Sequence, residues 1–223
     1  MILIFDYDGT CHDTLRAYGQ AVRSAVQWLS GQGYFPARPT DDRTLSRYLG
    51  MTTADMWADF LPGAPADITK QAAELVGSGL AAAAERKTAR LYAGIEPLCE
   101  MLRDMGHTLL ILSNCTRRYR DAHWESFGLG RYFAKFYASE DYGGIPKEEI
   151  FPHIRAEYPG RYCIIGDRLS DMRVGYVHGF PTVACHYGYG TAEELRDADY
   201  HVHSVTELTR LLQAGILPVQ ESD

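Results

Sequence analysis

Residues 1–10, MILIFDYDGT, place two aspartates directly after the first apolar run of the chain. Residues 1–5 are typical of a short buried strand. Past the C-terminal end of a strand the backbone can turn, so we expect Asp6 and Asp8 to project into the crevice where open α/β sheets bind ligands. Two crowded carboxylates repel each other unless a proton or a cation is present. The pair therefore predicts a metal site, an acid/base pair, or both.

The composition is that of an ordinary globular protein, with 223 residues, of which 46% are hydrophobic and 23% charged. The net charge of -7 argues against a nucleic-acid-binding protein, although helix N-termini, a lysine and a metal can still bind phosphate locally. No apolar stretch approaches membrane-spanning length, so no membrane partner is expected. The five cysteines lack the spacing of a disulfide framework or a zinc site. With no signal peptide, we expect a cytoplasmic protein.

Strands and helices alternate after Gly94, whereas the segment from Thr14 to about Ala89 is helical throughout. The alternation predicts the α/β class, with a doubly wound parallel sheet covered by helices on both faces. The helical segment separates the first strand from the next strand, so we interpret it as an insertion. We therefore expect a core domain of residues 1–14 and 90–223. Residues 15–89 would form a helical cap over the carboxyl edge of the sheet.

The expected elements of the core follow from apolar runs and helical periodicity. A capping box, in which a hydroxyl and a carboxyl satisfy each other's backbone donors, is expected at Thr191/Glu194 and at Ser204/Glu207. In the cap, the last helix is expected to bend near Gly77 and Gly79, and the chain after Leu217 is expected to be frayed. Strands are predicted at 109–112, 133–138, 162–165, 182–185 and 200–202, and helices at 116–127 and 148–158.

Three further polar motifs fall at the ends of predicted elements. Ser113-Asn114 follows the strand at 109–112, and Gly166-Asp167 through Asp171 follows the strand at 162–165. Lys147 stands at the start of a helix, after two glycines and a proline. Because parallel strands end at one edge of the sheet, these side chains are expected near Asp6 and Asp8.

Together these motifs resemble those of the haloacid dehalogenase superfamily of aspartate-nucleophile phosphohydrolases. The first motif is similar to residues 6–10, the second to Ser113-Asn114, the third to Lys147 and the fourth to residues 166–171. The similarity runs from Met1 to about Leu212, and the helical insertion corresponds to the helical cap of the family. Residues 187–190, with the segments at 193–195 and 198–200, further resemble the phosphoglycolate phosphatase-like branch.

The resemblance implies a role for each of these residues. Asp6 would be the nucleophile that forms an aspartyl-phosphate, and Asp8 the acid and base, with a raised pKa while Asp6 stays ionised. Ser113 and Lys147 would hold the phosphoryl oxygens. Mg²⁺ would be bound by an acidic set in which Asp8 contributes its backbone carbonyl and Asp171 orients waters or the lysine. That set is Asp6, Asp8, Asp167 and Asp171, and the expected substrate contacts are Gly9, Thr10, Asn114 and Arg47.

Each motif also has a purely structural interpretation. An Asp-Gly pair after a strand is commonly a turn, Ser113 can cap the following helix, and Lys147 can be a solvated lysine. For His12 we expect a structural, hydrogen-bonded histidine, although a contact with the leaving group is the alternative.

The arrangement as a whole predicts a Mg²⁺-dependent phosphatase that acts on a small phosphate monoester, phosphoglycolate-like or a sugar phosphate. A phosphomutase and a non-catalytic binding protein of the same fold are the alternatives, and the protein would be a monomer or a homodimer.

Overall fold

Six parallel strands form one sheet in a computed structural model of the chain, which describes residues 1–215. The strand order is β3-β2-β1-β4-β5-β6, so β1 lies in the middle of the sheet. Phe5 of β1 pairs with Ile111 of β2 and with Ile165 of β4, and the three strands therefore end at the same edge. The strands are β1 (Ile2–Phe5), β2 (Thr108–Ser113), β3 (Lys135–Ala138), β4 (Tyr162–Gly166), β5 (Thr182–Cys185) and β6 (Tyr200–Val202).

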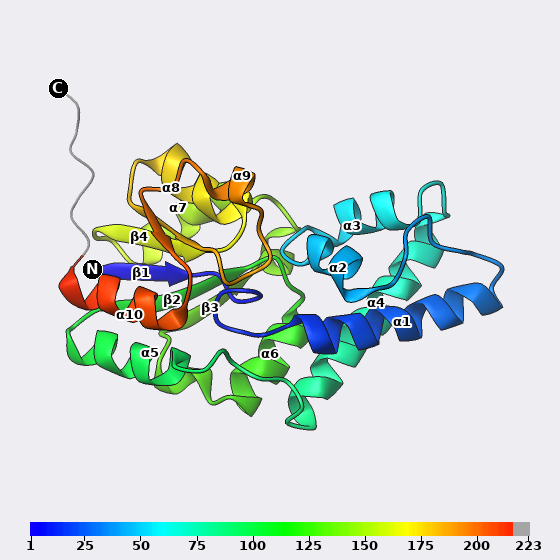
Figure 1. Cartoon of the computed structure of the whole chain (residues 1–223), viewed down its shortest axis with the longest axis horizontal. Helices are drawn as coiled ribbons and strands as arrows, with labels where there is room; N and C mark the ends of the chain where they lie inside the picture. The colour runs from blue at the N-terminus through cyan, green and yellow to red at the C-terminus, as the bar shows by residue number, and fades with distance from the viewer. Residues whose placement is uncertain (216–223) are drawn as a thin grey trace.

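Helices cover both faces of this sheet, which confirms the predicted doubly wound α/β architecture (Figure 1). Leu3 and Phe5 point into the cluster with α5, α6 and α10, whereas Ile2 and Ile4 point into the cluster with α7 and α8, as the two-residue period of a strand requires. The core helices are α5 (Ile95–Asp104), α6 (Arg117–Ser126), α7 (Lys147–Glu157), α8 (Leu169–His178), α9 (Ala192–Leu195) and α10 (Val205–Ala214), with 3-10 turns η2 (Leu129–Arg131) and η3 (Ser139–Tyr142).

The segment between β1 and α5 is helical, as predicted, and lies beyond the carboxyl edge of the sheet (Figure 1). It contains α1 (Leu15–Gly31), α2 (Asp42–Leu45), the 3-10 turn η1 (Ser46–Tyr48), α3 (Thr53–Phe60) and α4 (Ala66–Glu85). These helices bury a hydrophobic cluster of their own, and we call them the cap. The division at residues 14 and 90 stays a prediction.

Gly79 lies within α4, which runs as one helix from Ala66 to Glu85, and the bend near this residue stays a prediction. A Cβ atom at this position would lie 2.9 Å from the Cβ of Ala21 in α1. The glycine is therefore explained by the close approach of α1 and α4 instead of by a break in the helix.

The chain enters and leaves the cap at one place. The backbone N–H of Asp13 donates a hydrogen bond of 2.9 Å to the carbonyl of Arg90, and His12 and Leu91 form an antiparallel bridge. The outgoing and returning segments are thus paired with each other beside the end of β1.

Two helix starts test the predicted capping boxes. Thr191 and Glu194 form the reciprocal pair at α9. At α10, Ser204 accepts from the backbone N–H of Glu207, but the carboxylate of Glu207 accepts from His203 instead of Ser204, so the second box is only half formed.

Within residues 1–215, none of the helices combines the length and the apolar character needed to cross a bilayer. The predicted fraying after Leu217 concerns residues outside the described range.

Candidate active site

A buried lysine bridges two carboxylates where β1 and β4 end. The Nζ of Lys147, at the first turn of α7, donates to Asp6 Oδ1 at 2.5 Å and to Asp171 Oδ1 at 2.7 Å. All three side chains are at least 97% buried. The second oxygen of Asp6 is buried and has no hydrogen-bond partner among the described residues. An unpaired buried carboxylate oxygen is costly, so this atom is the one that a cation or a phosphorus centre would engage.

Asp167 completes the acidic cluster and is surrounded by glycines. Its Oδ1 accepts from the hydroxyl of Thr10 at 3.0 Å, and its Oδ2 accepts from the backbone N–H of Tyr189 at 2.7 Å. A Cβ atom on Gly9 or Gly188 would lie within 2.5 Å of this side chain. Close packing therefore fixes the position of the carboxylate.

Thr10 and Gly9 lie against Asp167, and their predicted role as substrate contacts stays a prediction. The Thr10 side chain is fully buried and its hydroxyl is directed at Asp167, while Gly9 adopts a φ of +94° that lets the backbone pass the same carboxylate. Both residues support Asp167, and neither lines the cavity described below.

The charge balance of the cluster favours a cation. Oxygens of Asp6, Asp167 and Asp171 lie within 4.8 Å of one another, and Lys147 is the ammonium that faces them. Burial, and then the charge of Asp171, raises the pKa of Asp6 well above its usual range and that of Asp167 to about 7. A hard divalent ion with oxygen ligands would relieve this repulsion. Asp171 is less suited as a ligand because its Oδ2 also accepts from the backbone N–H groups of Asp167 and Arg168.

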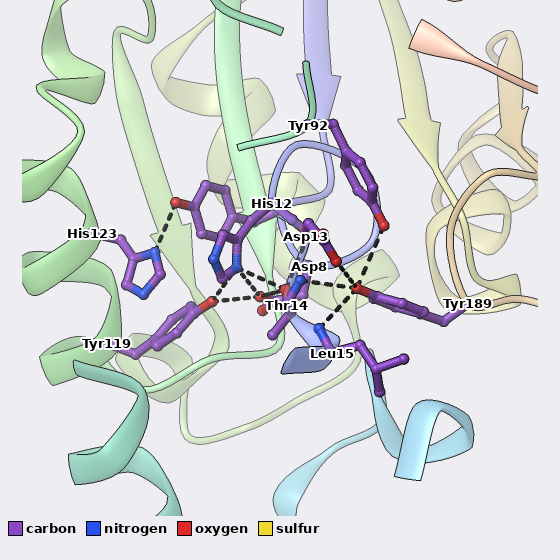
Figure 2. Close-up of polar contacts among 10 residues, drawn as sticks. Asp8, His12, Asp13, Thr14, Leu15, Tyr92, Tyr119, His123 and Tyr189 are labelled. Carbon is purple, nitrogen blue, oxygen red and sulfur yellow. Dashed lines mark hydrogen bonds and ion pairs between the residues drawn. The ribbon is translucent and has the colours of Figure 1, made fainter. Parts of the chain in front are cut away.

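Asp8 lies apart from this cluster, in a network of hydroxyls and imidazoles (Figure 2). Its Oδ1 accepts from Tyr119 at 2.5 Å and from Thr14 at 2.6 Å, and Nδ1 of His12 lies 3.3 Å away. Burial alone would raise the pKa of Asp8, but the hydrogen bonds and charge of these neighbours outweigh it and lower the pKa. Without cation or substrate, the pKa of Asp6 is thus raised and that of Asp8 lowered, and the order expected during catalysis stays a prediction.

His12 has the structural environment that the sequence favoured. Its ring is fully buried and packs against Tyr7 and His123, with Nδ1 also 2.7 Å from the hydroxyl of Thr14 and 3.0 Å from that of Tyr119. His12 therefore contacts the carboxylate of Asp8 but does not line the cavity.

A cavity of about 110 Å³ lies between the cap and the core, with Asp8 in its wall. Asn114 also lines it, and its side-chain N–H donates to the carbonyl of Gly50 in the cap at 3.0 Å. Ser113 is buried at the end of β2, two positions after the residue that pairs with Phe5. Arg47 is exposed and does not line this cavity, so the structure does not place it as the predicted substrate contact.

Arg168 is a functional candidate that the sequence did not single out. Its guanidinium donates to the carbonyls of Leu49 and Arg47 in the cap and is held by Glu194 at 3.0 Å. It thus ties the cap to the loop that carries Asp167. Its place directly after Asp167 was visible in the sequence, but its partners are about 120 residues away in the chain, and no local pattern reveals them.

Tyr189 is a second residue whose contacts between core and cap the sequence did not reveal, although it belongs to the motif at 187–190. Its backbone N–H holds Asp167, and its hydroxyl accepts from the backbone N–H groups of Thr14 and Leu15 at 2.9 and 3.0 Å, where α1 begins (Figure 2). One residue, through its backbone N–H and its hydroxyl, therefore connects the acidic cluster with the entry to the cap.

The comparisons with known proteins agree with this geometry. The family model for haloacid dehalogenase-like hydrolases matches residues 1–179. A 5'-nucleotidase from Pseudomonas aeruginosa is 30% identical over 56% of this chain and 58% of its own length, so that match spans little more than half of the relative. A phosphoglycolate phosphatase from Nitrosococcus oceani is 25% identical over 95% of this chain and 96% of its own.

Solved structures share the same fold. A crystal structure described as a predicted phosphatase from Clostridium acetobutylicum superposes with a TM-score of 0.80 at 22% identity, covering 96% of this chain and 98% of that one. The family match covers both the turn after β1 that contains Asp6 and the loop that contains Asp167. On this evidence, the chain belongs to the haloacid dehalogenase-like hydrolases.

Proposed function

We propose that this protein is a Mg²⁺-dependent phosphatase that hydrolyses a small phosphate monoester through an aspartyl-phosphate on Asp6. The observation that supports this most strongly is the Asp6 carboxylate, with one oxygen held by Lys147 and the other buried and unpaired. Relatives described as a 5'-nucleotidase and as phosphoglycolate phosphatases favour phosphoryl chemistry over the other reactions of the family.

The first step would transfer the phosphoryl group to the protein. The free oxygen of Asp6 attacks phosphorus, the bond from phosphorus to the ester oxygen breaks, and Asp8 gives its proton to the leaving oxygen. In the second step a water attacks phosphorus, Asp8 takes the proton of that water, and the bond to Asp6 breaks to release inorganic phosphate. Lys147 would neutralise charge on the phosphoryl oxygens, and the hydroxyl of Ser113 would donate a hydrogen bond to one of them.

Asp6, Asp167 and the backbone carbonyl of Asp8 would hold Mg²⁺, which when bound neutralises phosphoryl charge. A cation at this place would also lower the pKa values of Asp6 and Asp167, while a phosphoryl dianion near Asp8 would raise the pKa of Asp8. The pKa order needed for catalysis would then be reached only with cation and substrate bound.

Release of phosphate from p-nitrophenyl phosphate, with Mg²⁺ and with EDTA, tests the proposal. We expect turnover that requires Mg²⁺ and a base-labile phosphoenzyme after rapid quenching. A phosphoenzyme that persists against water and transfers its phosphate to a sugar phosphate would indicate a phosphomutase. Absence of both turnover and Mg²⁺ binding would indicate a binding protein.

A further inference from the structure

The cavity beside Asp8 has a distinct chemical character. Its walls are mainly aromatic rings, methionines and aliphatic side chains of the cap, among them Tyr18, Met51, Met56 and Trp57. Among residues 1–215, no lysine, arginine or histidine lines it, and Asp8 is the lining residue that carries a formal charge. Such a surface stabilises an apolar group and offers no counter-charge to an anion.

The phenol groups in the wall of this cavity add no positive charge that could pair with an anion. The hydroxyl of Tyr119 donates to Asp8, and that of Tyr48 donates to Asp59 at 2.5 Å. These two donors are therefore already engaged, and the phenol of Tyr18, the third in the wall, is neutral and supplies no counter-charge. A carboxylate or second phosphate placed here would lose its hydration without gaining an ionic partner.

Cationic side chains line a neighbouring cavity of about 270 Å³ instead. Lys147, Arg168 and Arg173 contribute to its wall, together with the carboxylates of Asp55, Glu148 and Glu194. The hydrogen bond between Asn114 and Gly50 joins core and cap at the boundary, because both residues line both cavities. Asp8 lines only the apolar cavity. Since a general acid must reach the leaving oxygen, the leaving group has to enter the cavity that contains Asp8.

From this arrangement we infer that the natural substrate is a phosphate monoester with an uncharged, largely apolar leaving group. A cavity of about 150 Å³ accommodates benzene, so the present volume suits about four to six non-hydrogen atoms. The inference rests on the proposed function, and it selects short alkyl or small aryl phosphates over carboxylated esters such as phosphoglycolate.

The test compares two esters of equal chain length, butyl phosphate and 3-carboxypropyl phosphate, by phosphate release at saturating Mg²⁺. We expect kcat/KM for the butyl ester to be about 100-fold higher, because the carboxylate finds no partner in the cavity. A ratio near one, or a preference for the charged ester, would overturn the inference while leaving the phosphatase assignment intact. Hydrolysis of neither ester, nor of p-nitrophenyl phosphate, would instead overturn both.

A variant makes the comparison more specific. Met51 is partly exposed and lies in the wall shared by the two cavities, so Met51→Lys brings a cation there on a side chain of similar length. We expect the preference for the butyl ester to fall about tenfold. Leu75→Lys places the same charge on the exposed face of α4, outside this cavity, and should leave the ratio unchanged. An unchanged ratio in a folded Met51→Lys protein would contradict the inference, and the wild-type comparison stands even if that variant does not fold.

Discussion

Lys147 Nζ lies 2.5 Å from Asp6 Oδ1 and thereby determines which oxygen of this carboxylate remains free. The same ammonium also donates to Asp171 Oδ1 at 2.7 Å, and this second contact helps to hold the lysine in place. The other oxygen of Asp6 is buried and has no hydrogen-bond partner among residues 1–215, and in the proposed mechanism it attacks phosphorus.

Replacing Asp6 by asparagine tests the nucleophile. Asp6→Asn keeps the shape of the side chain but removes its charge, so we expect turnover to fall to background, a loss of at least about 10³-fold, while the fold is retained. Phosphate release and circular dichroism measure the two outcomes. Normal turnover by this variant would refute the assignment of Asp6.

Binding of Mg²⁺ should depend on pH. Burial and the charge of Asp171 raise the pKa of Asp167 to about 7, so below this pH a proton competes with the cation. We expect the apparent affinity, measured by calorimetry, to fall up to about tenfold for each pH unit below 7. Asp167→Asn should abolish binding, whereas Asp104→Asn, on the surface at the end of α5, should not. Affinity that is constant between pH 6 and 8 would exclude Asp167 as a ligand.

The glycine beside Asp167 should be intolerant of even a methyl group. A Cβ atom at position 188 would lie 2.4 Å from the Cβ of Asp167, so Gly188→Ala has to displace the carboxylate. We expect at least about tenfold weaker Mg²⁺ binding. The matched control is Gly31→Ala at the end of α1, where nothing lies within 4 Å. Equal Mg²⁺ affinities of the two variants would show that the position of Asp167 is not critical.

Removal of the guanidinium that ties the cap to the core should affect substrate capture. Arg168→Met loses the contacts with the carbonyls of Leu49 and Arg47 and with Glu194. We expect about a tenfold rise in KM with unchanged Mg²⁺ affinity, because the cap closes less readily over the substrate. Arg103→Met, on the exposed side of α5, serves as the control. A KM equal to that of the wild type would argue against a role of Arg168 in closure.

The buried, neutral imidazole of His123 should lower the free energy of unfolding in mild acid. Burial, and then the charge of His12, lowers the pKa of His123 from 6.5 to about 3, so the folded protein keeps this ring neutral. Below pH 6.5 the unfolded chain binds a proton that the folded chain does not. The stability contributed by the neutral ring is therefore complete above pH 6.5 and is lost as the pH falls toward 3, by about 1.4 kcal/mol at pH 5.5. His123→Asn keeps an acceptor for Tyr7 and should flatten this part of the curve measured by urea unfolding; an unchanged curve would contradict the assignment.

The fold could be predicted largely because its signals are local. The apolar runs at 182–185 and 200–202 coincide with β5 and β6, and the polar residues after β1, β2 and β4 lie at one edge because the strands are parallel. The half-formed box at Ser204 shows the limit of local signals, since the carboxylate of Glu207 accepts from the backbone N–H of His203 and not from that of Ser204.

The electrostatics of the site could not be predicted from motifs. Tyr119, whose hydroxyl helps to lower the pKa of Asp8, lies 111 residues away in the chain and belongs to no motif. The roles of Arg168 and Tyr189 likewise depend on contacts that only the folded chain makes. For Thr10 the motif indicated the neighbourhood but not the hydrogen bond that its hydroxyl donates to Asp167, because that partner lies 157 residues away in the chain.

The paired segments at Asp13 and Arg90 have an evolutionary consequence. Because the chain departs and comes back at adjacent, hydrogen-bonded positions, the whole stretch between them can be exchanged for another without altering the register of β1 with β2. Such an exchange would keep the phosphoryl chemistry but replace the cap residues that line the substrate cavity. A single genetic step could then change the substrate specificity.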